Sequence, residues 1–239
     1  MSASSLTEPK PVRNTSCFSR ENLEQLTSRM TEYKLKAGER LFWEGEAADK
    51  LYYIVRGRVK LIKVSDEGRQ FILHMFQDGD LFGQAVPFEE VKHDCNAEVS
   101  EPSVIGVIQK HDFESLLQEH GGLALEFMKW MGLYDRMTQA KFRDLLLFGK
   151  LGALSSMLIR LQNTYGKPHP QGILIHKKVT NSELADMIGA SRENVNRMLS
   201  SLKEAEVIAS EKGFLVVKNL PYLKDICRCE NCPEYVCRT

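Results

Sequence analysis

The sequence predicts an α+β protein built from an antiparallel β-roll, a long helix, and a small helical domain that ends in an extended hairpin. Three patterns predict this fold. Short apolar runs between residues 33 and 108 are separated by a glycine about every 10 residues, as in all-β folds. Apolar residues between 125 and 147 recur at steps of three and four, which is typical of a helix packed lengthwise on a partner. Beyond residue 179, two short capped segments precede a glycine-centred hairpin.

Length and composition are those of an ordinary globular protein. The 239 residues suffice for one large domain or two smaller ones, and the formal net charge is zero, so any basic surface has to be local. From residue 150 to 226, basic side chains exceed acidic ones by about four. No apolar run approaches the roughly 18 residues of a membrane span, and the first residues lack the apolar core of a secretory signal. We therefore expect a cytoplasmic protein with no membrane partner.

The first part of the chain divides into an arm and a β-roll. Residues 1–17, with two prolines and many Ser and Thr, predict a loose arm. Residues 18–122 predict the β-roll domain, which opens with a short helix capped by Ser19 and apolar from Leu23 to Met30 on one face. Its expected strands span residues 40–43, 51–55, 59–64 and 71–76, and glycines such as Gly57 separate them.

Residues 123–149 predict a dimerisation helix with one unusual polar residue. The three-and-four steps are made by Trp130, Leu133, Met137, Ala140, Asp144 and Leu147. A carboxylate between two helices loses its water, so Asp144 needs a hydrogen-bond donor, a cation or a metal. The alternative is that Asp144 lies at the frayed end of the seam and is solvated.

Residues 150–225 predict a winged helix-turn-helix domain. Thr180 and Glu183 form a capping box, Gly189 breaks the first helix, and Ser191 caps the second. An extended hairpin centred on Gly213 follows at the position of a wing. A generic two-helix hairpin is the alternative, but the cap, the turn and the wing occur at compatible spacing.

The second helix of this unit carries the candidate DNA-binding residues. Its outward face, opposite the apolar side, presents Arg192, Glu193, Asn196 and Arg197. Arginine can donate two bonds to guanine and glutamate can accept from cytosine N4, so these side chains suit a major groove. Without the surrounding motif, such a face would be an ordinary charged helix surface.

Residues 226–239 form a cysteine cluster. A cytoplasmic protein keeps thiols reduced, so these cysteines indicate metal binding or redox chemistry rather than disulfides. Three of them have the spacing C-x2-C-x4-C, which suits an iron–sulfur cluster, whereas all four could hold a structural zinc ion. Simple thiol oxidation is a third interpretation. The four are Cys227, Cys229, Cys232 and Cys237, while Cys17 and Cys95 stand alone and are expected to be small apolar residues.

The string VTNSELADMIGASRENVNRMLSSL, residues 179–202, resembles the helix-turn-helix of the catabolite-activator and fumarate-nitrate-regulator (CRP/FNR) superfamily of bacterial transcription factors. The glycine-spaced strands are similar to the cyclic-nucleotide-binding-like sensor domain of that superfamily, and the 123–149 helix is similar to its dimerisation helix. The resemblance implies a homodimer that reads a palindrome in double-stranded DNA, with half-sites similar to TGTGA, and that recruits RNA polymerase.

The β-roll departs from the cyclic-AMP binders of that superfamily. They have Gly-Glu-Leu where this chain has Gly83-Gln84-Ala85, and Arg-Ser/Thr where it has Asp94 and Cys95. Because an aspartate repels a phosphate, we expect no cyclic nucleotide to bind.

The strings FMKWMG, KFRDLLLFGKLGAL and CENCPEYVC closely resemble the Bacillus-type fumarate-nitrate regulators. The resemblance implies an oxygen sensor that activates anaerobic respiration genes. It also implies a [4Fe-4S] cluster held by Cys229, Cys232, Cys237 and Asp144, with Cys227 as a spare thiol or alternative ligand. Carboxylate is a harder and weaker ligand for iron than thiolate, so oxidation is hypothesised to begin at Asp144. A regulator with a structural zinc tail and an iron–sulfur redox protein are the rival interpretations. No flavin or nicotinamide fingerprint is found, so we expect no enzyme activity.

Overall fold

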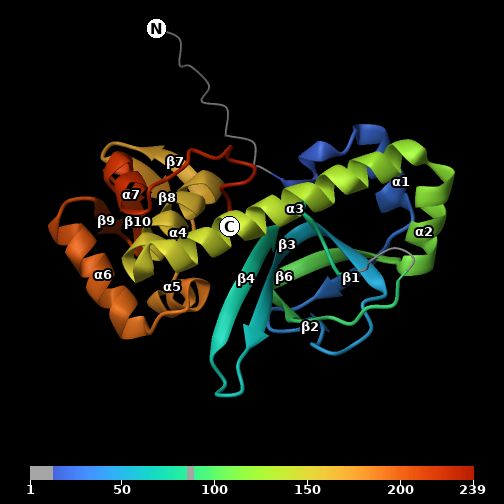
Figure 1. Ribbon diagram of the computed structural model, residues 1–239, viewed down its shortest axis with the longest axis horizontal. Coiled ribbons are helices and arrows are strands. Elements are labelled where there is room, and N and C mark those ends of the chain that lie inside the picture. The colour runs from blue at the N-terminus through green and yellow to red at the C-terminus, as the bar shows by residue number, and fades with distance from the viewer. Residues whose placement is uncertain (1–12, 85–88) are drawn as a thin grey trace, which may run out of the picture.

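A computed structural model describes residues 13–84 and 89–239. In it a β-roll and a helical domain lie along one long helix (Figure 1), as the fold class predicted. The β-roll contains η1 (Asn14–Cys17), α1 (Arg20–Ser28), β1 (Thr31–Leu35), β2 (Arg40–Phe42), β3 (Lys50–Val64), β4 (Gln70–Gln77), β5 (Leu81–Phe82), β6 (Asn96–Gln109) and α2 (Lys110–Glu119).

The strands of the β-roll pair antiparallel in the order β1-β6-β3-β4, with β2 on β6 and β5 on β3. Alternate side chains point inward and form an aromatic core. Stacked rings connect Tyr52 to Phe82, Phe82 to Phe76, and Phe76 to Tyr134 of the long helix. The β-roll core therefore extends directly onto that helix.

Two predictions about the β-roll were wrong in detail. Gly57 does not separate two strands, because β3 runs through it with register shifts on either side. With φ of +110°, Gly57 allows a bulge, and a Cβ there would lie 2.0 Å from Ser103 Oγ.

The predicted loose arm lies outside the described residues up to residue 12, but Asn14 and Thr15 are buried. The Asn14 amide donates to Asp80 Oδ1 at 2.8 Å, and Thr15 Oγ1 donates to the Gly79 carbonyl at 2.6 Å, so both residues belong to the β-roll.

The short helix α1 was predicted correctly. The Ser19 side chain accepts a hydrogen bond from the Asn22 amide at 3.2 Å, and Leu26 is fully buried. The helix ends at Ser28, before Met30, which packs at the edge of the same cluster as Leu26.

The prediction of which face of the long helix α3 (Gly121–Leu147) contacts a partner chain was wrong. Trp130, Leu133 and Met137 are buried against the chain's own β-roll and tail. Most of the residues assigned to an intermolecular seam therefore form the intramolecular face, and Leu147 alone among the six is exposed. The large apolar side chains exposed on α3 are Leu125, Met128, Met131, Phe142, Leu146 and Leu147.

The helical domain begins where α3 ends and the next helix starts at Gly149, whose φ is +62°. It contains α4 (Gly149–Tyr165), β7 (Gly166–His169), β8 (Gly172–Ile175), α5 (Asn181–Ile188), α6 (Arg192–Glu204), β9 (Ile208–Glu211), β10 (Phe214–Val217) and α7 (Leu220–Ile226). The strands form a sheet in the order β7-β8-β10-β9. Among the described residues, no helix is long and apolar enough to cross a membrane.

Candidate DNA-reading helix and cysteine-rich tail

Local sequence signals fold the α5–α6 pair. The capping box is confirmed, since Thr180 Oγ1 accepts from the Glu183 amide at 3.1 Å and the Glu183 carboxylate accepts from the Thr180 amide at 2.8 Å. Gly189 ends α5 in the left-handed region with φ of +60°, and the Ser191 side chain caps α6. The two helices join at a tight turn and share one core, into which Val195 is fully buried.

The four predicted DNA-binding residues lie on the exposed side of α6. Arg192, Glu193, Asn196 and Arg197 are all exposed, near the N-terminal end of the helix. Arg197 donates to the Asn194 side chain at 2.8 Å, which places its guanidinium along the first turns. Most of the helix lies on the side of the helical domain away from the β-roll (Figure 1), whereas its first residues face the β3–β4 hairpin across a cleft.

A wing follows α6, as predicted. Strands β9 and β10 pair antiparallel, and the turn between them has positive φ at Lys212 (50°) and Gly213 (85°). Two successive positive φ angles are those of a type I′ hairpin turn. Sequence analysis did not predict the second hairpin of this domain, β7–β8, whose first strand contains Gly166 and Pro168.

Asp144 is buried, not solvated, and its charge has partners. The side chain is 5% exposed, and Arg160 from α4 donates to Oδ2 at 2.9 Å. Arg143 donates to Oδ1 from Nε at 3.0 Å and from a terminal nitrogen at 2.6 Å. The Ser156 hydroxyl also donates to the carboxylate. The cost of burial is therefore offset in this structure by two arginines and a serine.

Arg160 is a residue that sequence analysis missed. It is 2% exposed, on the amphipathic helix α4, and besides Asp144 it reaches the tail, where it donates to the Val236 carbonyl at 3.3 Å. An arginine inside an apolar helix pattern was the available signal, because such a side chain needs a buried acceptor. Arg160 therefore connects α3, α4 and the tail.

The tail brings its cysteines to the same region. Cys227 and Cys237 are buried and Cys229 and Cys232 are half-buried, and all six cysteines of the chain are free thiols. Burial, together with the neighbouring Cys229 and Asp144 charges, raises the pKa of Cys227 to about 12. Burial also raises the pKa of Cys237 to about 11, although Arg160 opposes the shift. These thiols are protonated at neutral pH unless a cation replaces the proton.

The donor types fit an iron–sulfur cluster, but the donor atoms are not already gathered. Three soft thiols and one carboxylate lie in the region where α3, α4 and the tail join, and the Asn231 amide donates to Cys229 Sγ at 3.4 Å, a bond of the kind that tunes such clusters. Within residues 13–84 and 89–239, no three Cys, His, Asp or Glu side chains are arranged to hold a metal ion. Asp144 has to leave its arginines before it can bind iron.

The β-roll residues that depart from the pattern of the cyclic-AMP binders also lie together. The Gln84 amide nitrogen donates to the Asp94 carboxylate, and the Asp94 amide donates back to Gln84 Oε1 at 3.2 Å. Ala85 lies outside the described residues. Cys95 is buried, and burial raises its pKa to about 12. The absence of cyclic-nucleotide binding stays a prediction.

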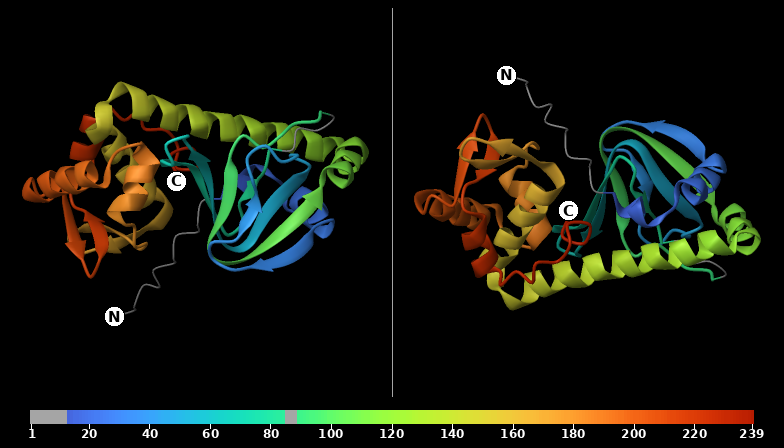
Figure 2. Two further views of the ribbon diagram at one scale, coloured as in Figure 1. Left: turned by 90° about the horizontal axis from the view of Figure 1, so that it is seen from below. Right: turned by 90° about the horizontal axis from the view of Figure 1, so that it is seen from above.

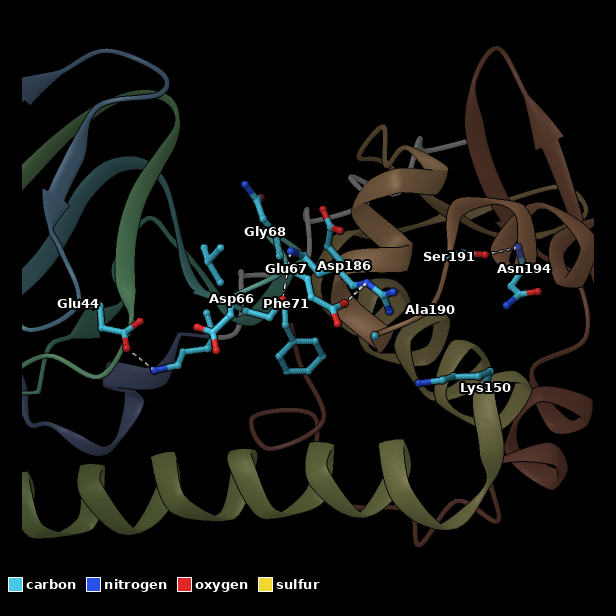
Figure 3. A pocket seen from close by; sticks show the side chains of 16 residues that line it. Glu44, Asp66, Glu67, Gly68, Phe71, Lys150, Asp186, Ala190, Ser191 and Asn194 are labelled. Carbon is cyan, nitrogen blue, oxygen red and sulfur yellow. Dashed lines mark hydrogen bonds and ion pairs between the residues drawn. The ribbon is translucent and has the colours of Figure 1, made fainter.

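A cleft separates the β3–β4 hairpin from the start of α6 (Figure 3), with a volume of about 1530 Å³. Its walls carry both signs of charge, and Glu44 and Lys63 already bond to each other. On the other wall, Ser191 and Asn194 are the cap residues of α6. Mixed charge of this kind selects neither an anion nor a cation.

Comparisons with known proteins agree with the fold and the reading helix. A model described as "Cyclic nucleotide-binding domain" matches residues 32–120, and one described as "Crp-like helix-turn-helix domain" matches residues 152–226. The chain belongs to the CRP/FNR family of transcription factors. It is thus a transcriptional regulator rather than an enzyme.

Among its relatives is the anaerobic regulatory protein of Bacillus subtilis (strain 168), which is 41% identical over 216 residues, 90% of this chain and 91% of the relative. The cAMP-activated global transcriptional regulator CRP of Salmonella typhimurium is 29% identical over 203 residues, covering 82% and 93% of the two chains. The structure of FixK2 from Bradyrhizobium japonicum matches with a TM-score of 0.71 at 19% identity, over 82% of this chain and 96% of that one. The last likeness concerns the fold alone.

Proposed function

We propose that this protein is an oxygen-responsive regulator of anaerobic respiration genes that binds palindromic, TGTGA-like DNA as a homodimer and recruits RNA polymerase. Cys229, Cys232, Cys237 and Asp144 would hold a [4Fe-4S] cluster, whose destruction by oxygen supplies the response. The observation that carries the proposal is the buried Asp144, which lies where α3, α4 and the thiol-bearing tail meet. The similarity to an anaerobic regulatory protein supports it.

The chain's own charges suit such a site. If Asp144 turned toward the thiols, Arg143 and Arg160 would lose its carboxylate as their partner and could offset part of the negative charge of three thiolates. The same residues would couple the site to geometry. Asp144 belongs to α3, Arg160 belongs to α4 of the DNA-reading domain, and Arg143 also pairs with Glu230 of the tail. A change of partner at Asp144 would therefore alter how α3 meets that domain.

The dimer would form through the exposed stripe of α3, opposite its buried face. Regulators of this family act as dimers. The stripe has large apolar side chains at both ends, with Leu125 and Met128, three residues apart, at one end and Phe142 and Leu146, four residues apart, at the other. A second copy packed along it would cover these side chains and place the two reading helices about a symmetry axis.

The first experiment is purification without oxygen, followed by iron, sulfide and zinc analysis and a visible spectrum before and after air. We expect about four irons and four sulfides per chain, a broad visible band that air bleaches, and loss of specific DNA binding with the band. Cys229→Ser should abolish the band, and Cys17→Ala, which changes a thiol in a hydrophobic cluster of the β-roll, should retain it. One zinc with no colour would overturn the oxygen response and leave the DNA-reading half intact.

A further inference from the structure

Residues 236–239, here called the tail tip, are buried between the helical domain and the β-roll. All four of these residues are less than one tenth exposed, and Arg238 is 3% exposed. Figure 2 shows the tail running from α7 past α3 to the edge of the sheet. A segment at the edge of a domain is normally loose unless something ties it down, and a buried arginine needs a partner. The tail tip has contacts on both sides.

On one side the tail tip is bound to α4. Asn163 donates to the Cys237 carbonyl at 2.8 Å, and the Thr239 amide donates to Thr164 Oγ1 at 3.1 Å. With the bond from Arg160 to Val236, these contacts hold the backbone of the tip along the last turns of α4. The tip therefore moves with the DNA-reading domain.

On the other side Arg238 binds the β-roll. Its two terminal nitrogens donate to the two oxygens of Asp80 at 2.7 and 2.5 Å, across 158 residues of sequence. Asp80 is fully buried and also accepts from the backbone amides of Asn14 and Gln77, at 2.8 and 3.0 Å. The two backbone amides hold the carboxylate in place, which makes a socket whose outer side matches the fork of a guanidinium.

We propose that the tail tip is an interdomain latch, in which Arg238 occupies the Asp80 socket and fixes the helical domain against the β-roll. If the two domains separated, an unpaired carboxylate and an unpaired guanidinium would be left where both are buried now, so the pair opposes separation. Because Arg238 directly follows Cys237, a displacement of Cys237 is transmitted to the β-roll through a single peptide unit. The latch itself requires no metal, so it stands or falls independently of the cluster.

The test compares Arg238→Gln, Asp80→Asn and the double variant with the wild type, using the reduced, metal-free full chain. The control is Arg20→Gln, which breaks the exposed pair with Glu24 on α1. Amide hydrogen exchange reports the socket and the last turns of α4, and small-angle X-ray scattering reports the spread of the domains. Far-UV circular dichroism confirms that each variant is folded.

We expect Arg238→Gln to speed exchange at residues 77–81 and in the last turns of α4 by at least about tenfold, and to broaden the distance distribution. The double variant should exchange no faster than the faster single one, because both remove the same bond. The exchange rate of Arg238→Lys, which keeps the charge but not the fork, should lie between those of the wild type and Arg238→Gln. Unchanged exchange at residues 77–81 would overturn the latch. Faster exchange with an unchanged scattering curve would also overturn it, because Arg238 would then have only a local role.

Discussion

Asp144 shows how one side chain can belong to two sites. In the structure its carboxylate accepts from Arg143, Arg160 and Ser156. In the proposed cluster-bound form it would be an iron ligand, so iron competes with Arg143 and Arg160 for the same two oxygens. A carboxylate that is already desolvated and held near the thiols loses little further hydration when it exchanges partners.

Asp144→Asn is expected to destabilise the metal-free protein by about 3 kcal/mol, because it leaves the buried Arg160 without a countercharge. Urea unfolding of the reduced, metal-free chain measures the effect. The control is Asp66→Asn in the exposed turn between β3 and β4, expected to lie within about 0.5 kcal/mol of the wild type. Equal effects of the two substitutions would contradict the role assigned to the ion pair.

His74 makes stability depend on pH. It is buried against α3 within hydrogen-bonding distance of Thr138, at 3.1 Å, and burial lowers its pKa from 6.5 to about 3, with help from the Lys141 charge. Below pH 6.5 the unfolded chain therefore binds a proton at His74, whereas the folded chain keeps this imidazole neutral down to about pH 3. Stability should fall as pH drops from 6.5 toward 3, by at most about 1.4 kcal/mol per pH unit from this group.

Thermal or urea unfolding between pH 4 and 8 tests this dependence. His74→Gln can keep a bond to Thr138 without titrating, so its stability should fall less steeply below pH 6.5. His111→Gln removes an exposed histidine and should follow the wild-type curve. A wild-type slope retained in His74→Gln would show that other groups dominate the acid response.

At the scale of elements, α6 and α3 are each amphipathic, but their exposed faces differ in chemistry. The outer face of α6 carries charged and amide groups that can form hydrogen bonds with base edges. The outer face of α3 carries large apolar side chains, and leaving them in contact with water costs about 25 cal/mol per Å² of apolar surface. One face therefore suits DNA and the other suits a second protein chain.

Glu193→Ala is expected to weaken specific binding by about 1–3 kcal/mol and to relax the preference at one base pair, since a single base contact is lost. Fluorescence anisotropy with the palindrome and with singly substituted palindromes measures both effects. Glu204→Ala, at the far end of α6 and equally exposed, is the control and should change neither. If Glu193→Ala binds every sequence with the same affinity change, Glu193 does not read a base.

Phe142→Glu is expected to shift the protein from dimer to monomer, because a charge within an apolar contact loses its hydration without a partner. Sedimentation velocity over a range of concentrations measures the shift. Val55→Glu places the same charge at an exposed apolar site on β3 and should leave the dimer intact. A dimer that persists in Phe142→Glu would place the subunit interface elsewhere.

At the scale of the whole molecule, two rigid units are joined along α3, and a dimer of them would carry two reading helices. Helix-turn-helix dimers bind half-sites about one helical turn apart, since two helices on one side of the DNA must enter successive major grooves. The spacing of the palindrome is thus a property of the whole dimer.

Inserting about five base pairs between the half-sites is expected to reduce the affinity to that of a single half-site, because half a turn moves the second site to the opposite side of the duplex. Electrophoretic mobility shifts with spaced duplexes at fixed salt measure this. Substituting five base pairs of the spacer without changing its length is the control. Full affinity after the insertion would indicate independent monomers or a flexible dimer.

Much of the fold followed from local patterns. Helix caps such as Ser19, Thr180 and Ser191, and the left-handed stop at Gly189, were predictable because caps and turns involve residues a few positions apart. The family resemblance assigned roles to Asp144, the cysteines and the α6 residues, and those roles stay predictions. Gly57 was misjudged because positive φ serves bulges and turns alike.

By itself, the sequence determined the fold class, the helix-turn-helix and the presence of a carboxylate that needed a partner. Only the tertiary structure decided which partner it has and which side of α3 faces inward. Asp144 meets Arg160, and Asp80 meets Arg238, across separations of 16 and 158 residues. Periodicity shows that a helix has an apolar face, but two apolar faces on one helix compete, and the shape of the neighbouring β-roll decides between them.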